Sequence, residues 1–593
     1  MRPSFKVLLL SSVMSAVSPA ALAQSGTTAP LQYAKQGWTA DERQAFYTTS
    51  QGSHMMPYSW YKALRRLDVD EPFGGDQLQR YGYLPNEKSK LNPEGLPVGF
   101  AIDGDAATGQ LGMTCAACHT AEIQYQKNGA TQRLRIDGAP ATANFQLFLT
   151  DLTAASRTTL SDADRFQKFA RAVLGSRYSA TRANALKGEF GDWVKQFGEF
   201  MDKSLPASPW GPARLDAFGM IFNRVAGKDL NIPANIKVAD APVSYPFLWN
   251  ASRQDKTQWN GGVPNGLYIN ALGRNTGEVF GVFADFGPKK LPSLPGGPPL
   301  IDFHNSSVRY DGLQTLEEKI AALKPPPWPF DLDQDLVDKG RILFAQYCGS
   351  CHEERRLPQG TWYTPVKAVG TDEKMFRNSL RRSDSGILEG ALSPNPPGSR
   401  LAKDELTVNI LATTVLGAQL AATFPIPPKL PIDFDHGPWR AISLDLVDLL
   451  ANGQTTPSLA SLLDPKTRDD LKAHINDRLA NMFKPPAPDA AAAYESRVLH
   501  GIWATAPYLH NGSVPSLWEL LLPPEQRSPS FMVGSRKFDP KNVGYVTNES
   551  PYKDGTLVAG SGAQLGNSNA GHDYGREMND DQRKALLEYL KQL

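Results

Sequence analysis

The alternation of apolar and polar residues predicts modest helices separated by irregular chain. Ahead of residue 348, apolar or small residues recur at helical spacing at Leu336, Val337, Gly340, Leu343, Phe344 and Tyr347. A terminal helix is expected after Asn579 or Asp580, with a buried side formed by Leu586, Leu587, Tyr589, Leu590 and Leu593. The same spacing predicts helices near residues 145–152 and 166–173, and residues 490–493 are expected to start another. The expected fold class is therefore mainly α with extensive irregular loops.

Prolines divide the chain and limit the length of its helices. The sequence holds 47 prolines in 593 residues, more than the roughly 5% that is usual. The run at 324–329, Lys-Pro-Pro-Pro-Trp-Pro, cannot continue a helix and predicts a boundary near residue 330. We therefore expect an N-terminal domain at 24–330, with insertions rich in glycine, proline and aromatic residues, and a C-terminal domain at 331–593.

The first 23 residues have the pattern of an export signal. Arg2 and Lys6 precede an apolar run to about Val17, and residues 21–23, Ala-Leu-Ala, supply a small-residue cleavage site. Since that run is shorter than the ~20 apolar residues of a membrane helix, we interpret residues 1–23 as a cleaved signal peptide rather than an uncleaved anchor. The predicted location is secreted or periplasmic, with no stable membrane insertion.

Charge and cysteine content exclude two classes of protein and point to a third. Lys and Arg number 62 against 61 Asp and Glu, which leaves no positive excess for nucleic acid, and 4 cysteines make no disulfide scaffold. All the cysteines lie in Cys-Ala-Ala-Cys-His at 115–119 and Cys-Gly-Ser-Cys-His at 348–352. Thiols at this spacing can form thioethers with the two vinyl groups of haem, and the adjacent histidine can ligate iron. The residues predicted to hold two covalently bound haems c are Cys115, Cys118, His119, Cys348, Cys351 and His352.

A single four-cysteine zinc site is the alternative, but zinc sites usually separate their cysteine pairs by roughly 15–20 residues. His119 and His352 are therefore the predicted proximal iron ligands. An electron-carrying haem needs a second strong protein ligand, whereas a haem that handles O2 or peroxide needs an open or displaceable site. His572, in the glycine-bearing loop 569–575 before the terminal helix, is the best-placed distal metal ligand. Met578, Tyr574 and a plain loop histidine remain the alternatives there.

The motifs resemble those of a known superfamily. The chain resembles the bacterial di-haem cytochrome c peroxidase and MauG superfamily in three features. These are both haem motifs, the late loop before the last helix, and residues 506–517 (Ala-Pro-Tyr-Leu-His-Asn-Gly-Ser-Val-Pro-Ser-Leu). Within this superfamily the chain is most similar to the secreted rubber oxygenases. The similarity rests on the wide haem spacing, His572, residues 501–505 (Gly-Ile-Trp-Ala-Thr) and residues 273–281 (Gly-Arg-Asn-Thr-Gly-Glu-Val-Phe-Gly). The resemblance implies two cytochrome c-type haem domains, the first with large insertions.

The resemblance also implies where catalysis takes place. The N-terminal haem would be the reactive one, with the catalytic residues Glu278 near it as a proton carrier and Phe280 in the lining of an apolar pocket. The alternatives are a surface or salt-bridged acid for Glu278 and core packing for Phe280. Trp259 and Trp503 are candidates for an electron relay or for packing, and His510 is expected to be structural or to support a neighbouring ligand. Some relatives also suggest a calcium ion.

Three functions follow from these expectations. The leading hypothesis is a secreted di-haem oxygenase whose partners are O2 and an apolar polyisoprenoid, and which cleaves C=C bonds. The alternatives are a peroxidase, with hydrogen peroxide and an electron-donor protein as partners, and an electron-transfer cytochrome with both irons closed by protein ligands.

Overall fold

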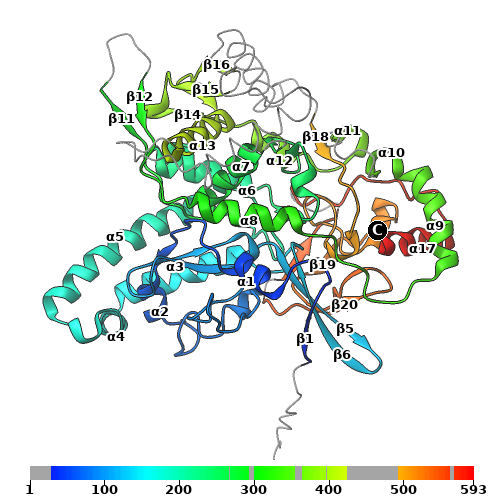
Figure 1. The fold of residues 1–593 in the computed structure, drawn as a ribbon, viewed down its shortest axis with the longest axis horizontal. Helices are drawn as coiled ribbons and strands as arrows, with labels where there is room; N and C mark the ends of the chain where they lie inside the picture. The colour runs from blue at the N-terminus through cyan, green and yellow to red at the C-terminus, as the bar shows by residue number, and fades with distance from the viewer. Residues whose placement is uncertain are drawn as a thin grey trace, which may run out of the picture.

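The computed structural model describes residues 29–265, 268–292, 299–353, 363–394, 397–423, 492–553, 555–560 and 566–593 (Figure 1). The predicted signal peptide lies outside these residues. None of the helices in the described ranges has the length and apolar character of a bilayer span. The prediction of a mainly α fold with two cytochrome c-type domains is wrong, because the structure is 41% helical and 17% strand, with many small sheets.

The longest sheet pairing follows directly after the first Cys-x-x-Cys-His motif. Strands β5 (Thr120–Lys127) and β6 (Ala130–Asp137) form an antiparallel hairpin, and β1 (Leu31–Tyr33) runs parallel to β6. Asn128 and Gly129 close the hairpin with φ of 54° and 75°. Positive φ at both central residues is typical of a type I′ turn, which favours Asn-Gly and matches the twist of the strands.

The other sheets are small. Strands β2 (Met56–Pro57), β4 (Gln110–Met113) and β3 (Phe100–Asp103) form one antiparallel sheet just before the first motif. The two-stranded antiparallel sheets pair β7 (Arg214–Leu215) with β8 (Val243–Ser244), β9 (Lys256–Thr257) with β10 (Val263–Pro264), β11 (Lys289–Leu291) with β12 (Leu300–Asp302), β13 (Tyr363–Pro365) with β18 (Ala493–Glu495), β14 (Arg382–Asp384) with β17 (Asp404–Leu406), β15 (Leu392–Pro394) with β16 (Pro397–Arg400), β19 (Ser530–Met532) with β22 (Thr556–Val558), and β20 (Phe538–Asp539) with β21 (Gly544–Tyr545).

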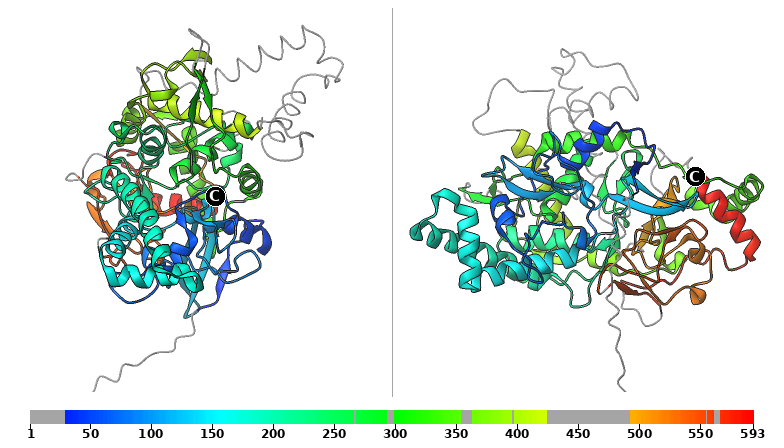
Figure 2. Two further views of the ribbon diagram at one scale, coloured as in Figure 1. Left: turned by 90° about the vertical axis from the view of Figure 1, so that its left-hand side faces the viewer. Right: turned by 90° about the horizontal axis from the view of Figure 1, so that it is seen from below.

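Helices gather at two ends of the molecule (Figures 1 and 2). At one end α3 (Phe145–Ser161), α4 (Ala163–Leu174) and α5 (Ala180–Ser204) pack together, which confirms the helices predicted near residues 145–152 and 166–173. At the other end α9 (Gln334–Tyr347) packs along α17 (Asp580–Gln592), and both were also predicted. Asn579 caps α17 in a reciprocal capping box with Gln582.

Between these ends, α7 (Tyr268–Gly281) lies beside α6 (Ala217–Phe222), α8 (Tyr310–Ala322) and α13 (Thr407–Thr423). The remaining α-helices are short: α1 (Ala40–Thr48), α2 (Tyr58–Ala63), α10 (Gly349–His352), α11 (Val366–Val369), α12 (Lys374–Ser379) and α16 (Leu517–Leu520). Where a helix was expected to start at residues 490–493, the described part of that segment leads into strand β18.

The N-terminal and C-terminal parts of the chain interlock. The backbone N–H of Gln124 in β5 donates to the carbonyl of Arg536 at 2.7 Å, and Ser244 N–H donates to the carbonyl of His510 at 2.9 Å. The hydroxyl of Tyr552 donates to the carbonyl of Thr142 at 3.2 Å. The predicted domain boundary at residue 330 stays a prediction. Backbone hydrogen bonds join the segments before and after this residue.

Candidate functional site

The first cysteine motif forms a tight turn between β4 and β5. The Thr114 side chain accepts from the backbone N–H of Ala116 and caps a short 3-10 turn at Cys115–Ala117. A Cβ on Gly99 would lie 2.0 Å from the backbone nitrogen of Ala117, so only glycine allows the neighbouring chain to approach this turn. The turn therefore places both thiols and the following histidine at one cavity.

A cavity of about 170 Å³ lies beside this motif, and its lining includes Cys115, Cys118 and His119. Burial lowers the pKa of His119 to about 4, so the imidazole is neutral and keeps a lone pair at neutral pH. Among the described residues that line this cavity, His119 is the sole histidine. Met113 and Met220 also line it, and they are the thioether candidates for a second ligand.

Glu278 reaches the same cavity from helix α7. Its Oε1 accepts a hydrogen bond of 2.6 Å from the side-chain amide of Gln258. Burial raises the pKa of Glu278, and the nearby positive charge of Arg274 opposes that rise. Glu278 is thus not an exposed loop acid but a partly buried carboxyl on a helix, and it can hold a proton.

The structure does not bring Phe280 into this cavity. Phe280 is fully buried on the other side of α7, where its ring centroid lies 4.7 Å from that of Phe286. Successive positions on a helix point about 100° apart, which separates Phe280 from Glu278 by more than half a turn. A catalytic role for Phe280 gains no support from this position.

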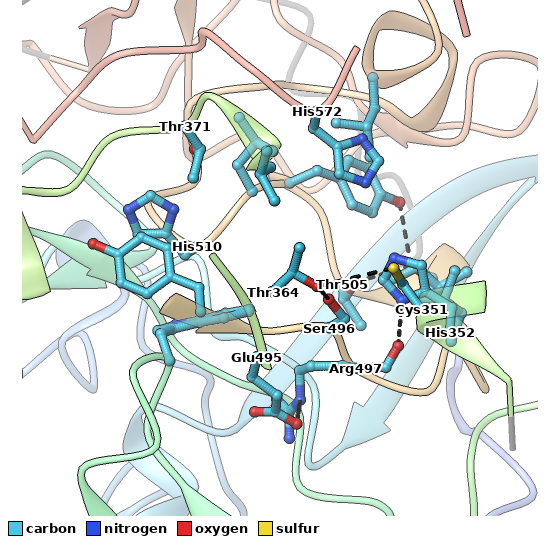
Figure 3. Close-up of a pocket in the computed structure, with 18 of the residues that line it drawn as sticks. Cys351, His352, Thr364, Thr371, Glu495, Ser496, Arg497, Thr505, His510 and His572 are labelled. Carbon is cyan, nitrogen blue, oxygen red and sulfur yellow. Dashed lines mark hydrogen bonds and ion pairs between the residues drawn. The ribbon is translucent and has the colours of Figure 1, made fainter. Parts of the chain in front are cut away.

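The second motif begins at Cys348, directly after α9, and its residues 349–352 form the short helix α10, which ends at His352. The ring Nδ1 of His352 lies 2.6 Å from the backbone carbonyl of Arg497. Because a carbonyl can only accept, Nδ1 carries the proton and Nε2 keeps its lone pair for a metal. The adjoining cavity has a volume of about 210 Å³ and is lined by Cys348, Cys351 and His352 (Figure 3).

His572 faces His352 across this second cavity (Figure 3). The centroids of their rings lie 6.3 Å apart. A metal bound to both imidazoles at about 2 Å would require a separation close to this value. The Nδ1 of His572 is buried without a hydrogen-bond partner, and burial lowers the pKa of the ring to about 3. The pair therefore fits a haem iron held from both faces, although iron ligation by His572 stays a prediction.

The loop that carries His572 has a fixed shape. The guanidinium of Arg527 donates to the carbonyls of Asn569, Gly571 and His572 at 2.6, 2.8 and 3.1 Å. The backbone N–H of His572 donates to the carbonyl of Val369 at 2.8 Å. Of the alternative ligands, Tyr574 lines the same cavity but is 40% exposed, and Met578 is buried in the core beside α17.

One wall is shared by the two cavities. We call this the shared wall; the residues that line both cavities are Ser244, Tyr245, Pro246, Phe247, Trp259, Glu495 and Arg497. Trp259 thus lies between the two motifs, with its indole N–H donating to the carbonyl of Ser244 at 3.1 Å. Trp503 lines neither cavity and packs against Trp328 and Phe538. His510 lies in the wall of the second cavity against Tyr494, at a centroid distance of 4.3 Å.

Sequence reasoning missed Glu495 and Arg497, because neither residue belongs to a motif. It also missed a third cavity of about 110 Å³ between α7 and α13. This third cavity shares Ile221, Gln258, Arg274 and Glu278 with the cavity beside His119, and its remaining lining is largely apolar. An apolar space therefore adjoins Glu278 on the side away from the cysteine motif.

Each cysteine pair lines its own cavity, so the fold does not bring the four cysteines together as one zinc site. None of the four cysteines forms a disulfide. In the ranges that the structure describes, no group of three or more His, Cys, Asp or Glu side chains is arranged to hold a metal ion. Calcium stays an expectation.

Comparison with known proteins agrees with a cytochrome site. Residues 493–532, which include part of the shared wall, match a family model described as RoxA-like, cytochrome c-like. Such a match indicates covalently bound haem c and an oxidoreductase. The chain is similar to the uncharacterized protein y4iJ of Sinorhizobium fredii (strain NBRC 101917 / NGR234), with 30% identity over 94% of this chain and 92% of that protein. The uncharacterized protein y4iM of the same organism is 24% identical over 68% of this chain and 75% of its own length.

Proposed function

We propose that this chain, which belongs to the same family as protein y4iJ of Sinorhizobium fredii, is a secreted or periplasmic di-haem dioxygenase that cleaves C=C bonds of an apolar polyisoprenoid. The net reaction breaks one C=C bond and the O–O bond and forms two carbonyl groups, so atoms and electrons balance without another reductant. The motifs also support a relationship to the di-haem peroxidase and MauG superfamily, which we include in the proposal.

The difference between the two cavities carries this proposal. Two imidazoles face one another beside the second motif, at a centroid distance of 6.3 Å, whereas His119 has no opposing imidazole among the described residues of its cavity. A haem with one open face can meet a small oxidant, whereas a haem with two imidazole ligands serves electron transfer or structure. The asymmetry supports one reactive centre and one closed centre.

The chain's own groups suit an apolar substrate. A haem on His119 would supply the redox chemistry that activates O2. Gln258 fixes the carboxyl of Glu278, which can donate a proton at the cavity wall. The apolar third cavity, which shares Glu278, would bind the hydrocarbon and exclude water.

Oxygen uptake with polyisoprene latex tests the proposal. We expect consumption of O2 without added peroxide and the release of fragments that end in carbonyl groups. A variant with Cys115 and Cys118 replaced by serine, which keeps the second motif, should lose this activity. Peroxide-dependent oxidation of a reduced cytochrome with no action on latex would instead favour a peroxidase. Failure of carbon monoxide to bind either reduced haem would leave an electron-transfer cytochrome.

A further inference from the structure

A buried cation lies in the wall between the two cavities. The side chain of Arg497 is only 8% exposed, yet the residue lines both cavities. Its guanidinium lies over the ring of Phe247, 4.1 Å from the centroid, and 5.7 Å from the centroid of the Trp259 ring. Both rings belong to the shared wall, so the charge sits between the two motifs.

Most donors of this guanidinium lack an acceptor. Nη2 of Arg497 donates to Oε1 of Gln254 at 3.3 Å, but Nε and Nη1 are buried without a hydrogen-bond partner. Glu495 Oε1 forms a buried ion pair with this guanidinium, 3.3 Å from Nε, and it also accepts from the side-chain amide of Gln254. The charge therefore has a partner, while Nη1 keeps no acceptor. Buried polar groups are nearly always paired, so unpaired donors at a cavity wall indicate a missing acceptor.

Two other buried arginines have acceptors for their donors, whereas Arg135 and Arg381 each keep an unpaired Nε but line neither cavity. Arg583 has the same 8% exposure, and its donors reach the carbonyls of Leu521 and Gly575 and the carboxylate of Asp580. Arg214 donates to the carbonyls of Trp210 and Asn511. Neither of these arginines lines the cavities beside the motifs. Unpaired donors at a cavity are therefore specific to Arg497 in this comparison.

We propose that the free donors of Arg497 bind a carboxylate that enters the cavity beside His119, and that this carboxylate is a haem propionate. The inference rests on the proposed function, because it assumes haem at the first motif. A guanidinium suits a carboxylate through charge-assisted, bidentate hydrogen bonds. Since the carbonyl of the same residue holds Nδ1 of His352, Arg497 is a positioning residue that contacts both sites.

Redox titration of the intact di-haem protein tests this inference. Removing the cation in Arg497→Gln raises the pKa of the propionate and leaves more negative charge near the iron at high pH. We expect the midpoint potential of the CO-binding haem to fall and to become pH-dependent over the neutral range, where the native value is flat. Arg497→Lys keeps the positive charge but cannot form bidentate hydrogen bonds, so we expect a smaller shift of the midpoint potential in the same direction. This variant replaces Arg497→Gln in the test if Arg497→Gln does not fold.

Two control variants distinguish binding of a propionate by Arg497 from a general effect of removing a buried charge and from titration of Glu495. Arg43 is 7% exposed and paired with buried Asp137, so Arg43→Gln removes a matched ion pair that lines neither cavity and should leave the potential pH-independent. If Glu495 were the titrating group, the double variant E495Q/R497Q would regain a flat potential, and that result would overturn the inference.

Haem content separates failure of the inference from failure of the function. Haem stoichiometry is measured in every variant. A native protein without covalent haem would overturn the proposed function and this inference together. Full haem content with an unchanged, pH-independent potential in Arg497→Gln would overturn the inference alone.

Discussion

At the scale of single residues, the two candidate iron sites differ in which imidazoles they offer. His352 has a defined tautomer because its Nδ1 donates to a carbonyl at 2.6 Å, and His572 faces it with an unpaired ring nitrogen. The cavity beside His119 instead offers a carboxyl, Glu278, held by Gln258. These differences lead to two residue-level predictions.

Replacing His572 by alanine should open the second site. Loss of one imidazole leaves the haem at His352 with a vacant position, so one more haem per molecule should bind carbon monoxide after reduction. The absorption spectrum of the reduced protein with and without carbon monoxide measures this change. Tyr574→Phe, in the same cavity, should leave the count unchanged; if it alone raised the count, Tyr574 would be the ligand.

Glu278→Gln should lower activity on latex by about 10²–10⁴-fold, the usual contribution of a positioned acid. The raised pKa of Glu278 keeps the carboxyl protonated to higher pH than usual, so native activity should fall as the pH rises through that pKa. The variant should lose this limb of the pH profile while both haem spectra stay native. Glu199→Gln, at an exposed position on α5, is the control, and equal activity of E278Q and E199Q would contradict the role.

At the scale of elements, local signals predicted some segments and missed others. The helices α9 and α17 follow from apolar spacing and from the cap at Asn579. The β5–β6 hairpin was missed although Asn128 and Gly129 are the strongest short signal for a type I′ turn. Helix α7 was hidden by its glycines, at 273, 277 and 281. A Cβ on Gly281 would lie 2.5 Å from Ile221, so that glycine permits close packing on α6.

Contacts between remote segments could not be predicted from local pattern. The motif sequences identified the cysteines and adjacent histidines, but not that residues 244–247, 259, 495 and 497 form one wall. Arg497 carries no sequence signal, since its role depends on which groups lie near it after folding. Phe280 and Glu278 are close in sequence, and only the helix shows that they point to different sides.

Gly340→Ala should destabilise the contact of α9 with α17. A Cβ at this position would lie 2.0 Å from the carbonyl oxygen of Ala585, which forces the helices apart. We expect a loss of about 1–3 kcal/mol, typical of overpacking, in chemical denaturation followed by circular dichroism. Because α9 runs into Cys348, the absorption spectrum of the haem proposed at the second motif should also change.

Gly188→Ala is the matched substitution. Gly188 lies in α5 with open space around a Cβ, so alanine should raise stability by roughly 0.5–1 kcal/mol through helix propensity. Equal destabilisation by both substitutions would show that the close approach at Gly340 is not the cause.

At the scale of the whole molecule, a buried charge cluster ties the hairpin to the C-terminal segment. Glu122 is fully buried and lies 3.0 Å from Arg133, 3.1 Å from Arg135 and 3.8 Å from Arg536. Burial alone would raise the pKa of Glu122, but the hydrogen bond from Arg133 and the charges of Arg536 and Arg135 bring it below its ordinary value. The ionised carboxylate therefore stabilises the native fold.

Glu122→Gln should cost about 3–5 kcal/mol at neutral pH, because it leaves buried guanidinium groups without a counter-charge. The lowered pKa means that this stabilisation is complete above the unfolded value of 4.5 and is lost as the pH falls through the folded-state pKa. Denaturant titrations at several pH values should show the gap between native and variant shrinking in acid. Glu549→Gln removes an exposed partner of Lys537 and should change stability by less than about 0.5 kcal/mol; a gap that stays constant with pH would contradict the assignment.

The common partition also limits how the protein can be altered. A substitution anywhere from Ser244 to Phe247 would reshape the cavities beside His119 and His352 together. A change made there to fit another substrate would therefore also alter the proposed electron-transfer site. Residues on α13 such as Leu411 and Val415 border only the outer apolar space. Under the proposed function, substitutions that alter which substrate fits should therefore be tolerated better on that helix than in the shared wall.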